Sequence, residues 1–161
     1  RKIASNSRRA GSGLGLDLGF SYTEGAFIAE ESPAPSPEDT DNTYVPDARP
    51  GCRAPHFWME TKAGKTSSLD LFGKGWVLIA GSDVKAGPWV EVAQRCVIPI
   101  AAYQLGEEIV CNSPEVEKLY GIGSEGMVMI RPDGIVALRT KHFVADPQHY
   151  LSESLSKILR C

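Results

Sequence analysis

The apolar run at residues 76–81, Trp-Val-Leu-Ile-Ala-Gly, limits the possible folds more than any other feature of the chain. It is continuous rather than alternating and is bordered by glycines, which is typical of a strand buried on both faces of a sheet. With 161 residues, the chain is long enough to cover such a strand within one domain. The sequence therefore predicts an α/β fold built around this strand.

Helix and hairpin signals follow the central strand. Pro88, Ser113-Pro114 and Asp146-Pro147 are typical helix starts, and the turn at residues 131–134 predicts a hairpin. In chain order we expect a strand at 67–72, the central strand, a helix at 88–98, a possible strand within 101–110, a helix at 113–120, a hairpin at 126–139 and a last helix from residue 146. The order strand, helix, strand, helix, hairpin, helix is that of a thioredoxin-like fold, with a central sheet flanked by helices.

Composition divides the chain into three parts. Residues 1–13 are basic and small, which predicts a flexible arm. Residues 14–45 are expected to form an N-terminal extension. In it, apolar alternation around Glu24-Gly25 favours a β-hairpin at 14–28, and an acidic loop with three prolines follows. Residues 46–161 are assigned to the thioredoxin-like domain.

Charge and cysteine usage exclude several classes of protein. A net charge of −3 and a pI near 5.6 offer no basic field for nucleic acid. No apolar run is long enough to cross a bilayer, and no export leader is visible, so we expect no membrane association and a cytoplasmic location. The four cysteines show no CxxC pair and no spacing suited to a metal. We therefore expect unpaired thiols and no metal site.

Three motifs carry a resemblance to a known family. They are Arg-Pro-Gly-Cys-Arg-Ala-Pro-His at residues 49–56, Ser-Leu-Asp-Leu-Phe-Gly at 68–73 and Arg-Pro-Asp-Gly at 131–134. In this order and spacing they resemble the C-terminal domain of FAD-dependent aromatic hydroxylases, the phenol-hydroxylase-like monooxygenases that act on phenols and aromatic polyketides. The resemblance covers roughly residues 15–160 and implies a thioredoxin-like fold. It also implies that the flavin is carried by a separate N-terminal domain.

Cofactor binding and redox chemistry are not expected of this chain. The family's flavin-binding signatures have no counterpart here, and the glycines at residues 11–15 do not follow a predicted strand. Thioredoxin-type exchange needs a cysteine at the start of the helix after the central strand. The segment at 82–89 contains none. We therefore predict no cofactor, no flavin site and no redox-active cysteine pair.

The polar side chains Asp47, Arg49, Arg53 and His56 lie among three prolines and form the densest functional set in the sequence. One interpretation is structural: the two arginines form ion pairs, bond loop carbonyls and hold this segment in place. The other is catalytic: His56 acts as an acid or base, while an arginine holds an enolate or phenolate oxygen.

These interpretations lead to two functional hypotheses. In the first, the chain is a stand-alone or excised C-terminal domain of an aromatic hydroxylase that acts in assembly. It would form a dimer or bind a parent or partner monooxygenase. The residues expected on its interaction surface are Arg49, Arg53, His56, Trp58, Tyr22 and Phe27.

In the second hypothesis, the chain is a cofactor-free cyclase, isomerase or lyase that acts on an aromatic polyketide-like intermediate of secondary metabolism. Such an enzyme needs only a shaped apolar pocket and one or two groups that move protons or hold an oxyanion. The candidate residues are His56, Arg53, Tyr22 and Tyr44. An enclosed cavity with one of these side chains inside it would favour this hypothesis.

Overall fold

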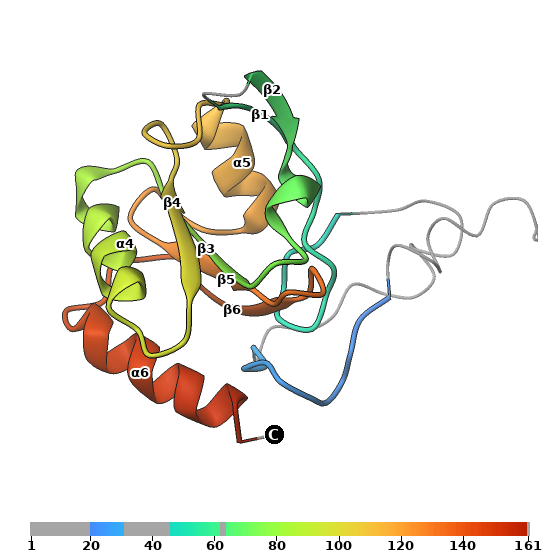
Figure 1. Ribbon diagram of the computed structural model, residues 1–161, viewed down its shortest axis with the longest axis vertical. Helices are drawn as coiled ribbons and strands as arrows, with labels where there is room; N and C mark the ends of the chain where they lie inside the picture. Colours follow the sequence, from blue (N-terminus) through green and yellow to red (C-terminus); the bar gives the residue numbers. More distant parts are fainter. Residues whose placement is uncertain (1–19, 31–45, 62–63, 161) are drawn as a thin grey trace, which may run out of the picture.

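A four-stranded mixed sheet forms the centre of the protein (Figure 1). The computed structural model describes residues 20–30, 46–61 and 64–160. The strands are β3 (Trp76–Ala80), β4 (Ile100–Gln104), β5 (Met127–Ile130) and β6 (Val136–Thr140), and their order in the sheet is β4-β3-β5-β6. β3 is parallel to β4 and antiparallel to β5, and β5 is antiparallel to β6.

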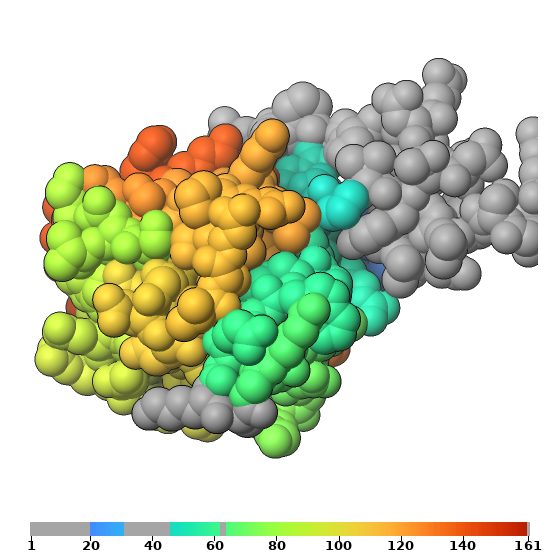
Figure 2. Space-filling view, turned by 90° about the horizontal axis from the view of Figure 1, so that it is seen from above, coloured from blue at the N-terminus to red at the C-terminus, as the bar shows by residue number. Residues whose placement is uncertain are grey.

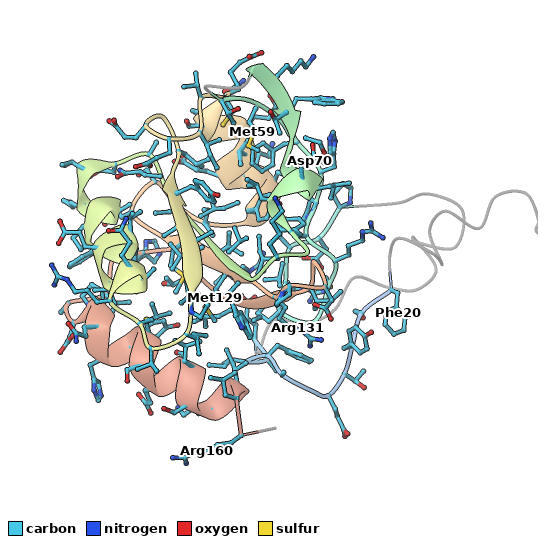
Figure 3. All side chains as sticks on the ribbon, in the orientation of Figure 1. Phe20, Met59, Asp70, Met129, Arg131 and Arg160 are labelled. Atoms are coloured by element: carbon cyan, nitrogen blue, oxygen red, sulfur yellow. The ribbon has the colours of Figure 1, made fainter. Side chains whose placement is uncertain are left out.

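Helices cover both faces of this sheet. Alternate residues of β3 point to opposite sides, so that Val77 and Ile79 face one core cluster and Leu78 and Ala80 face another. The first cluster is closed by α5 (Ser113–Tyr120), and the second by α4 (Gly87–Gln94) and α6 (Pro147–Ile158). Met129, in the middle of the sheet, is fully buried (Figure 3). The residues of the central run are therefore apolar because both faces of their strand are covered.

The helix boundaries follow the local sequence signals. Each of α4, α5 and α6 has a proline in its first turn, where the missing N–H costs nothing. Asp146 caps α6, because its carboxylate accepts a hydrogen bond from the backbone N–H of His149 at 2.9 Å. Gly121 ends α5 in the left-handed conformation, with φ of 63°. The predicted order of strand, helix, strand, helix, hairpin and helix is confirmed, as is the α/β fold with a central sheet.

One prediction about a short segment needs correction. Residues 67–72 do not form a strand: β2 ends at Ser67, and a 3₁₀ helix, η1 (Ser68–Leu71), follows it. The reason is local, because the hydroxyl of Ser67 accepts a hydrogen bond from the N–H of Leu69 and starts the turn. The Ser68 hydroxyl is buried and accepts from the N–H of Phe57 at 3.0 Å.

An antiparallel hairpin precedes the central sheet, as expected, and it is formed by β1 (Trp58–Thr61) and β2 (Gly64–Ser67). Of the range expected to form it, residues 14–19 lie outside the described part of the chain. Within residues 20–28, Ser21 forms an isolated bridge with Cys52 instead of a local strand pair. This segment therefore packs along the domain, where Phe27 is half-buried against the cluster beneath α4 and α6.

Tyr120 joins α5 to the loop that precedes β1, and its removal tests this connection. Its buried hydroxyl donates to the carbonyl of Pro55 at 2.6 Å. Tyr120→Phe would leave that carbonyl without its donor, so we expect the free energy of unfolding to fall by about 1–3 kcal/mol. Urea titration followed by tryptophan fluorescence would measure the change.

Tyr150→Phe is the matched control. Tyr150 is half-buried with its ring against Trp89, and its hydroxyl makes no hydrogen bond to any described residue. We expect the stability of this variant to stay close to that of the wild type. An equal loss in both variants would show that the bond from Tyr120 to Pro55 does not stabilise the fold.

Candidate interaction surface

The motif segment is held along the outer edge of β6. The N–H of Gly51 donates to the carbonyl of Val136, and the N–H of Val136 donates to the carbonyl of Cys52, both at 2.9 Å. The N–H of Ala54 donates to Gly134 at 2.8 Å. Gly51 is required here, because its φ is 91° and a Cβ atom would lie 2.6 Å from the carbonyl oxygen of Tyr22. The backbone of the motif is thus part of the fold.

Arg49 pairs with its neighbour Asp47. Its Nε donates to Oδ2 at 2.6 Å and its backbone N–H to Oδ1 at 3.0 Å, and both side chains are largely buried. The pair fixes the turn that leads into Gly51. For Arg49, the geometry therefore favours the structural interpretation of the sequence.

The turn at residues 131–134 joins the motif to two other segments. Its own shape is set by Arg131, whose guanidinium binds the carboxylate of Asp133 through two nitrogens. The carbonyl of Pro132 accepts from the N–H of Gly73 at 2.9 Å, which ties the turn to the loop after η1. The Arg131 guanidinium also lies 5.9 Å from the centre of the Tyr22 ring. Figure 3 shows Arg131 at this side of the molecule.

Arg53, His56 and Trp58 remain exposed on this fixed backbone. Trp58 is 57% exposed, and its ring lies edge-on to that of His56, with centres 4.9 Å apart. The ammonium group of Lys65, on the paired strand β2, lies 5.0 Å from the centre of the Trp58 ring. Together with Leu69, which is 39% exposed, these residues form a surface that we call the Trp58 face.

A shallow hollow borders the Trp58 face. It has a volume of about 270 Å³ and is open to solvent, and Arg53, Leu69, Phe72 and Asp133 are among the residues that line it. Figure 2 shows the segment that carries the face, in teal and green, beside α5, in orange, on the surface of the protein. The guanidinium of Arg53 makes no ion pair with any described residue.

The other described residues predicted for the surface lie apart from the Trp58 face. Tyr22 is 43% exposed and packs edge-on against Phe20, with ring centres 4.8 Å apart. Tyr22, Phe27 and Arg49 line a second open hollow of about 230 Å³. Tyr44 lies outside the described residues. The structure therefore brings Arg53, His56 and Trp58 together and places Tyr22 and Phe27 in a separate group.

Lys65 and Leu69 also belong to the Trp58 face, although no sequence signal indicated that they would. Lys65 sits in a short polar strand with no motif, and only its pairing opposite Glu60 places it near Trp58. Leu69 lies in the Ser-Leu-Asp-Leu-Phe-Gly motif and was expected in a strand. The 3₁₀ turn exposes it instead.

His56 does not line any of the hollows beside Trp76, Leu155, Arg53 and Tyr22. Each of these hollows is open to solvent. No cluster of three or more potential metal ligands occurs in the part of the chain that the structure describes. In the same part, no helix is both long and apolar enough to cross a membrane.

The segment between β3 and α4 contains no cysteine. Ser82 follows β3, and both its N–H and its hydroxyl donate to one carboxylate oxygen of Glu117, at 2.9 and 2.7 Å. Cys52, Cys96 and Cys111 are free thiols, each partly buried. Burial raises the pKa of all three above the ordinary value for a thiol.

These raised pKa values predict slow alkylation. A higher thiol pKa means less thiolate at neutral pH, and the thiolate is the nucleophile. We expect Cys52, Cys96 and Cys111 to react with iodoacetamide more slowly at pH 7 than in the urea-unfolded chain, with rates that rise as the pH increases. Peptide mass spectrometry over a pH series measures each site. A cysteine that reacts faster in the folded chain would contradict the prediction.

Comparison with known proteins settles the family. Residues 47–160 match the family described as aromatic-ring hydroxylase, C-terminal. The chain belongs to this family. It is 36% identical over 146 residues to aklavinone 12-hydroxylase RdmE of Streptomyces purpurascens, which covers 88% of this chain and 26% of that protein. It is 31% identical over 145 residues to tetracenomycin B2 monooxygenase-dioxygenase of Streptomyces olivaceus, with the same coverage.

Solved structures of flavin enzymes contain the same fold. A ternary complex of aklavinone-11 hydroxylase with FAD and aklavinone matches with a TM-score of 0.78 and 34% identity, over 92% of this chain and 28% of that one. The resemblance to the C-terminal domain of aromatic hydroxylases is thus confirmed. This chain spans about a quarter of the length of the curated relatives that it matches: it covers 26% of both the aklavinone and the tetracenomycin enzyme.

Proposed function

We propose that this chain is a non-catalytic assembly domain that packs through the Trp58 face against the flavin-bearing part of an aromatic hydroxylase. That part would belong either to the same polypeptide or to a separate one. The observation that carries the proposal is the exposure of Trp58, His56 and Arg53 on a segment whose residues 51–54 are hydrogen-bonded to β6 and to the turn before it, and whose Trp58 lies in the β1–β2 pair. Tryptophan and arginine are enriched where protein interfaces gain most of their binding energy.

The rigidity of the Trp58 face supports a role in binding. The backbone of residues 51–54 is hydrogen-bonded to β6 and to the turn that precedes it, and the Tyr120 hydroxyl donates to the carbonyl of Pro55. A side chain on a fixed backbone loses little conformational freedom when it binds, which leaves more of the contact energy for affinity. The open hollow beside Arg53 offers room for an apolar side chain of the partner.

We further propose that the fold is a thioredoxin-like scaffold without thioredoxin chemistry. The parallel pair β3 and β4, followed by the antiparallel strands β5 and β6, supports this assignment. In the loop between β3 and η2 the side chain of Ser82 is bound to Glu117, and residues 82–89 contain no cysteine. A fold alone does not determine function. The support for the assembly role therefore comes from the exposed residues of the Trp58 face.

The alternative of a cofactor-free cyclase, isomerase or lyase gains no support from the described geometry. His56 is exposed beside Trp58 and does not line the hollow beside Arg53 or the one beside Tyr22. Arg53 and Tyr22 line different hollows. A catalyst of this kind needs its acid, base and oxyanion donors around one enclosed site.

Co-purification tests the assembly role. The partner is the flavin-bearing part of aklavinone 12-hydroxylase RdmE, ended where its similarity to this chain begins and expressed together with the tagged chain. We expect a stable complex that retains FAD. Trp58→Ala and Arg53→Ala should each weaken it at least tenfold, since a central interface residue contributes about 2 kcal/mol.

Val84→Ala is the control for these substitutions. Val84 is 86% exposed, in a 3₁₀ turn before α4, outside the Trp58 face, and its replacement should leave the affinity unchanged. Absence of a complex, or equal affinity for all three variants and the wild type, would reject the proposal.

A further inference from the structure

The two outer strands of the central sheet differ in how their free edges are treated. The edge of β6 is covered by the chain itself: Gly51 and Cys52 bond to Val136, and the N–H of Ile28 donates to Ala137 at 2.8 Å. The opposite edge, β4, pairs only with β3 among the described strands. Figure 1 shows β4 and β6 at the two sides of the sheet.

Two hydrogen bonds fix the direction of the polar groups of β4. The N–H of Leu105 donates inward to the carbonyl of Ala80 at 3.0 Å, whereas the N–H of Gln104 donates outward to the carboxylate of Glu108 at 2.9 Å. Backbone groups alternate along a strand. The N–H and C=O groups of Ile100 and Ala102 therefore point outward, as the N–H of Gln104 does. Of these three N–H groups, only the one of Gln104 is bound by a described side chain, that of Glu108.

β4 lacks the features that usually protect an edge. Its sequence, Ile-Ala-Ala-Tyr-Gln, contains no charged residue and no proline, and the register shift recorded in this sheet lies in the pair of β5 with β6. Charges, prolines and bulges are the common means of preventing edge-to-edge pairing. Pro99 precedes the strand, and the polar backbone groups of Gln104 are bound by the chain itself. Between Ile100 and Ala102, however, nothing within the strand opposes the addition of another strand.

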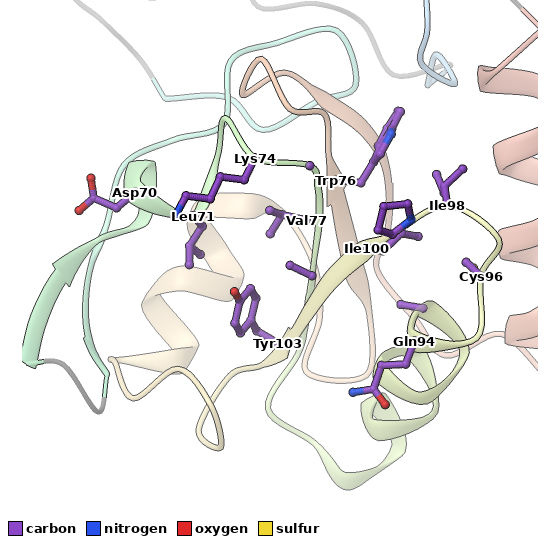
Figure 4. A pocket seen from close by; sticks show the side chains of 14 residues that line it. Asp70, Leu71, Lys74, Trp76, Val77, Gln94, Cys96, Ile98, Ile100 and Tyr103 are labelled. Atoms are coloured by element: carbon purple, nitrogen blue, oxygen red, sulfur yellow. The ribbon is translucent and has the colours of Figure 1, made fainter.

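Among the described residues, the surroundings leave this edge accessible. An open hollow of about 480 Å³ lies over it (Figure 4). Asp70 and Lys74, from the segment around η1, lie on one side of β4, and Gln94 and Cys96, from α4 and the turn after it, lie on the other. The edge thus forms the floor of a groove whose walls stand apart.

We propose that a second copy of this chain binds at β4, antiparallel and related by a two-fold axis through Ala101. Ile100 of one copy then pairs with Ala102 of the other, and this pairing uses all four free N–H and C=O sets without displacing Glu108. The resulting sheet is continuous through both copies. The proposal does not rest on the proposed function, because it uses the opposite edge from the one that carries the motif.

The side chains and charges at this edge suit a copy of the same chain. Ala101 is exposed and small, so two such residues can face each other at the close, non-hydrogen-bonded position of an antiparallel pair. The rim carries one acid, Asp70, and one base, Lys74. An identical surface therefore meets no net repulsion there, which makes it self-complementary as a two-fold interface requires.

Charge-swapped variants test the arrangement in sedimentation velocity experiments on the full chain. We expect a concentration-dependent dimer of the wild type. Ala101→Lys and Ala101→Glu, each alone, should weaken it about three- to fivefold, since like charges face each other across the axis. An equal mixture of the two variants should dimerise more tightly than either alone. A monomer at every concentration, or a dimer unaffected by these changes, would overturn the proposal.

Cross-linking gives a second measurement that needs no change in affinity. Residues opposite each other at a non-hydrogen-bonded pair have Cα atoms about 4.5 Å apart, within the reach of a disulfide. Ala101→Cys should therefore form a disulfide-linked dimer under mild oxidation. Val84→Cys, also exposed to solvent but outside the strand that pairs across the axis, should not, and neither should the wild type with its own cysteines. Equal cross-linking of all three proteins would contradict the two-fold axis at Ala101.

Discussion

The backbone hydrogen bonds between residues 51–54 and the edge of β6 are the contacts on which the functional surface depends. They bind the outward N–H and C=O of Val136 in β6, which would otherwise stay unpaired at this edge of the sheet. They also fix the course of the chain into β1. Because Pro50 and Pro55 allow few backbone conformations, this course is already restricted before folding. These bonds position the backbone of Arg53 and the start of the segment that continues to His56 and Trp58.

The elements that could be predicted from sequence are those with a strong local cause. β3 is an uninterrupted apolar run, α5 and α6 begin at prolines, and the hairpin of β5 and β6 surrounds an Arg-Pro-Asp-Gly turn. The failures have equally physical causes. In residues 67–72, the hydroxyl groups of two serines bond to backbone N–H groups and divert the chain from a strand into a 3₁₀ turn. Apolar alternation alone could not reveal this competition.

The candidate surface was only partly visible in the sequence. Arg53, His56 and Trp58 share one motif, so their proximity was expected, and the structure shows them on one face. The same motif gave no means of separating Arg49, which pairs with Asp47, from Arg53, which does not. Tyr22 could not be placed either, because its position depends on contacts with residues about thirty and more than a hundred positions away.

The contact between Ser82 and Glu117 limits what protein engineering could do with this domain. A helix start usually favours a negative charge, and redox enzymes use that preference to keep a sulfur ionised. Ser82 lies in the loop after β3, before η2, and its backbone N–H is already bound to a carboxylate. A cysteine introduced at Ser82 would face this negative charge at close range, and its ionisation would be opposed. Building a reactive thiol at this position would therefore require the removal of Glu117 as well as the addition of sulfur.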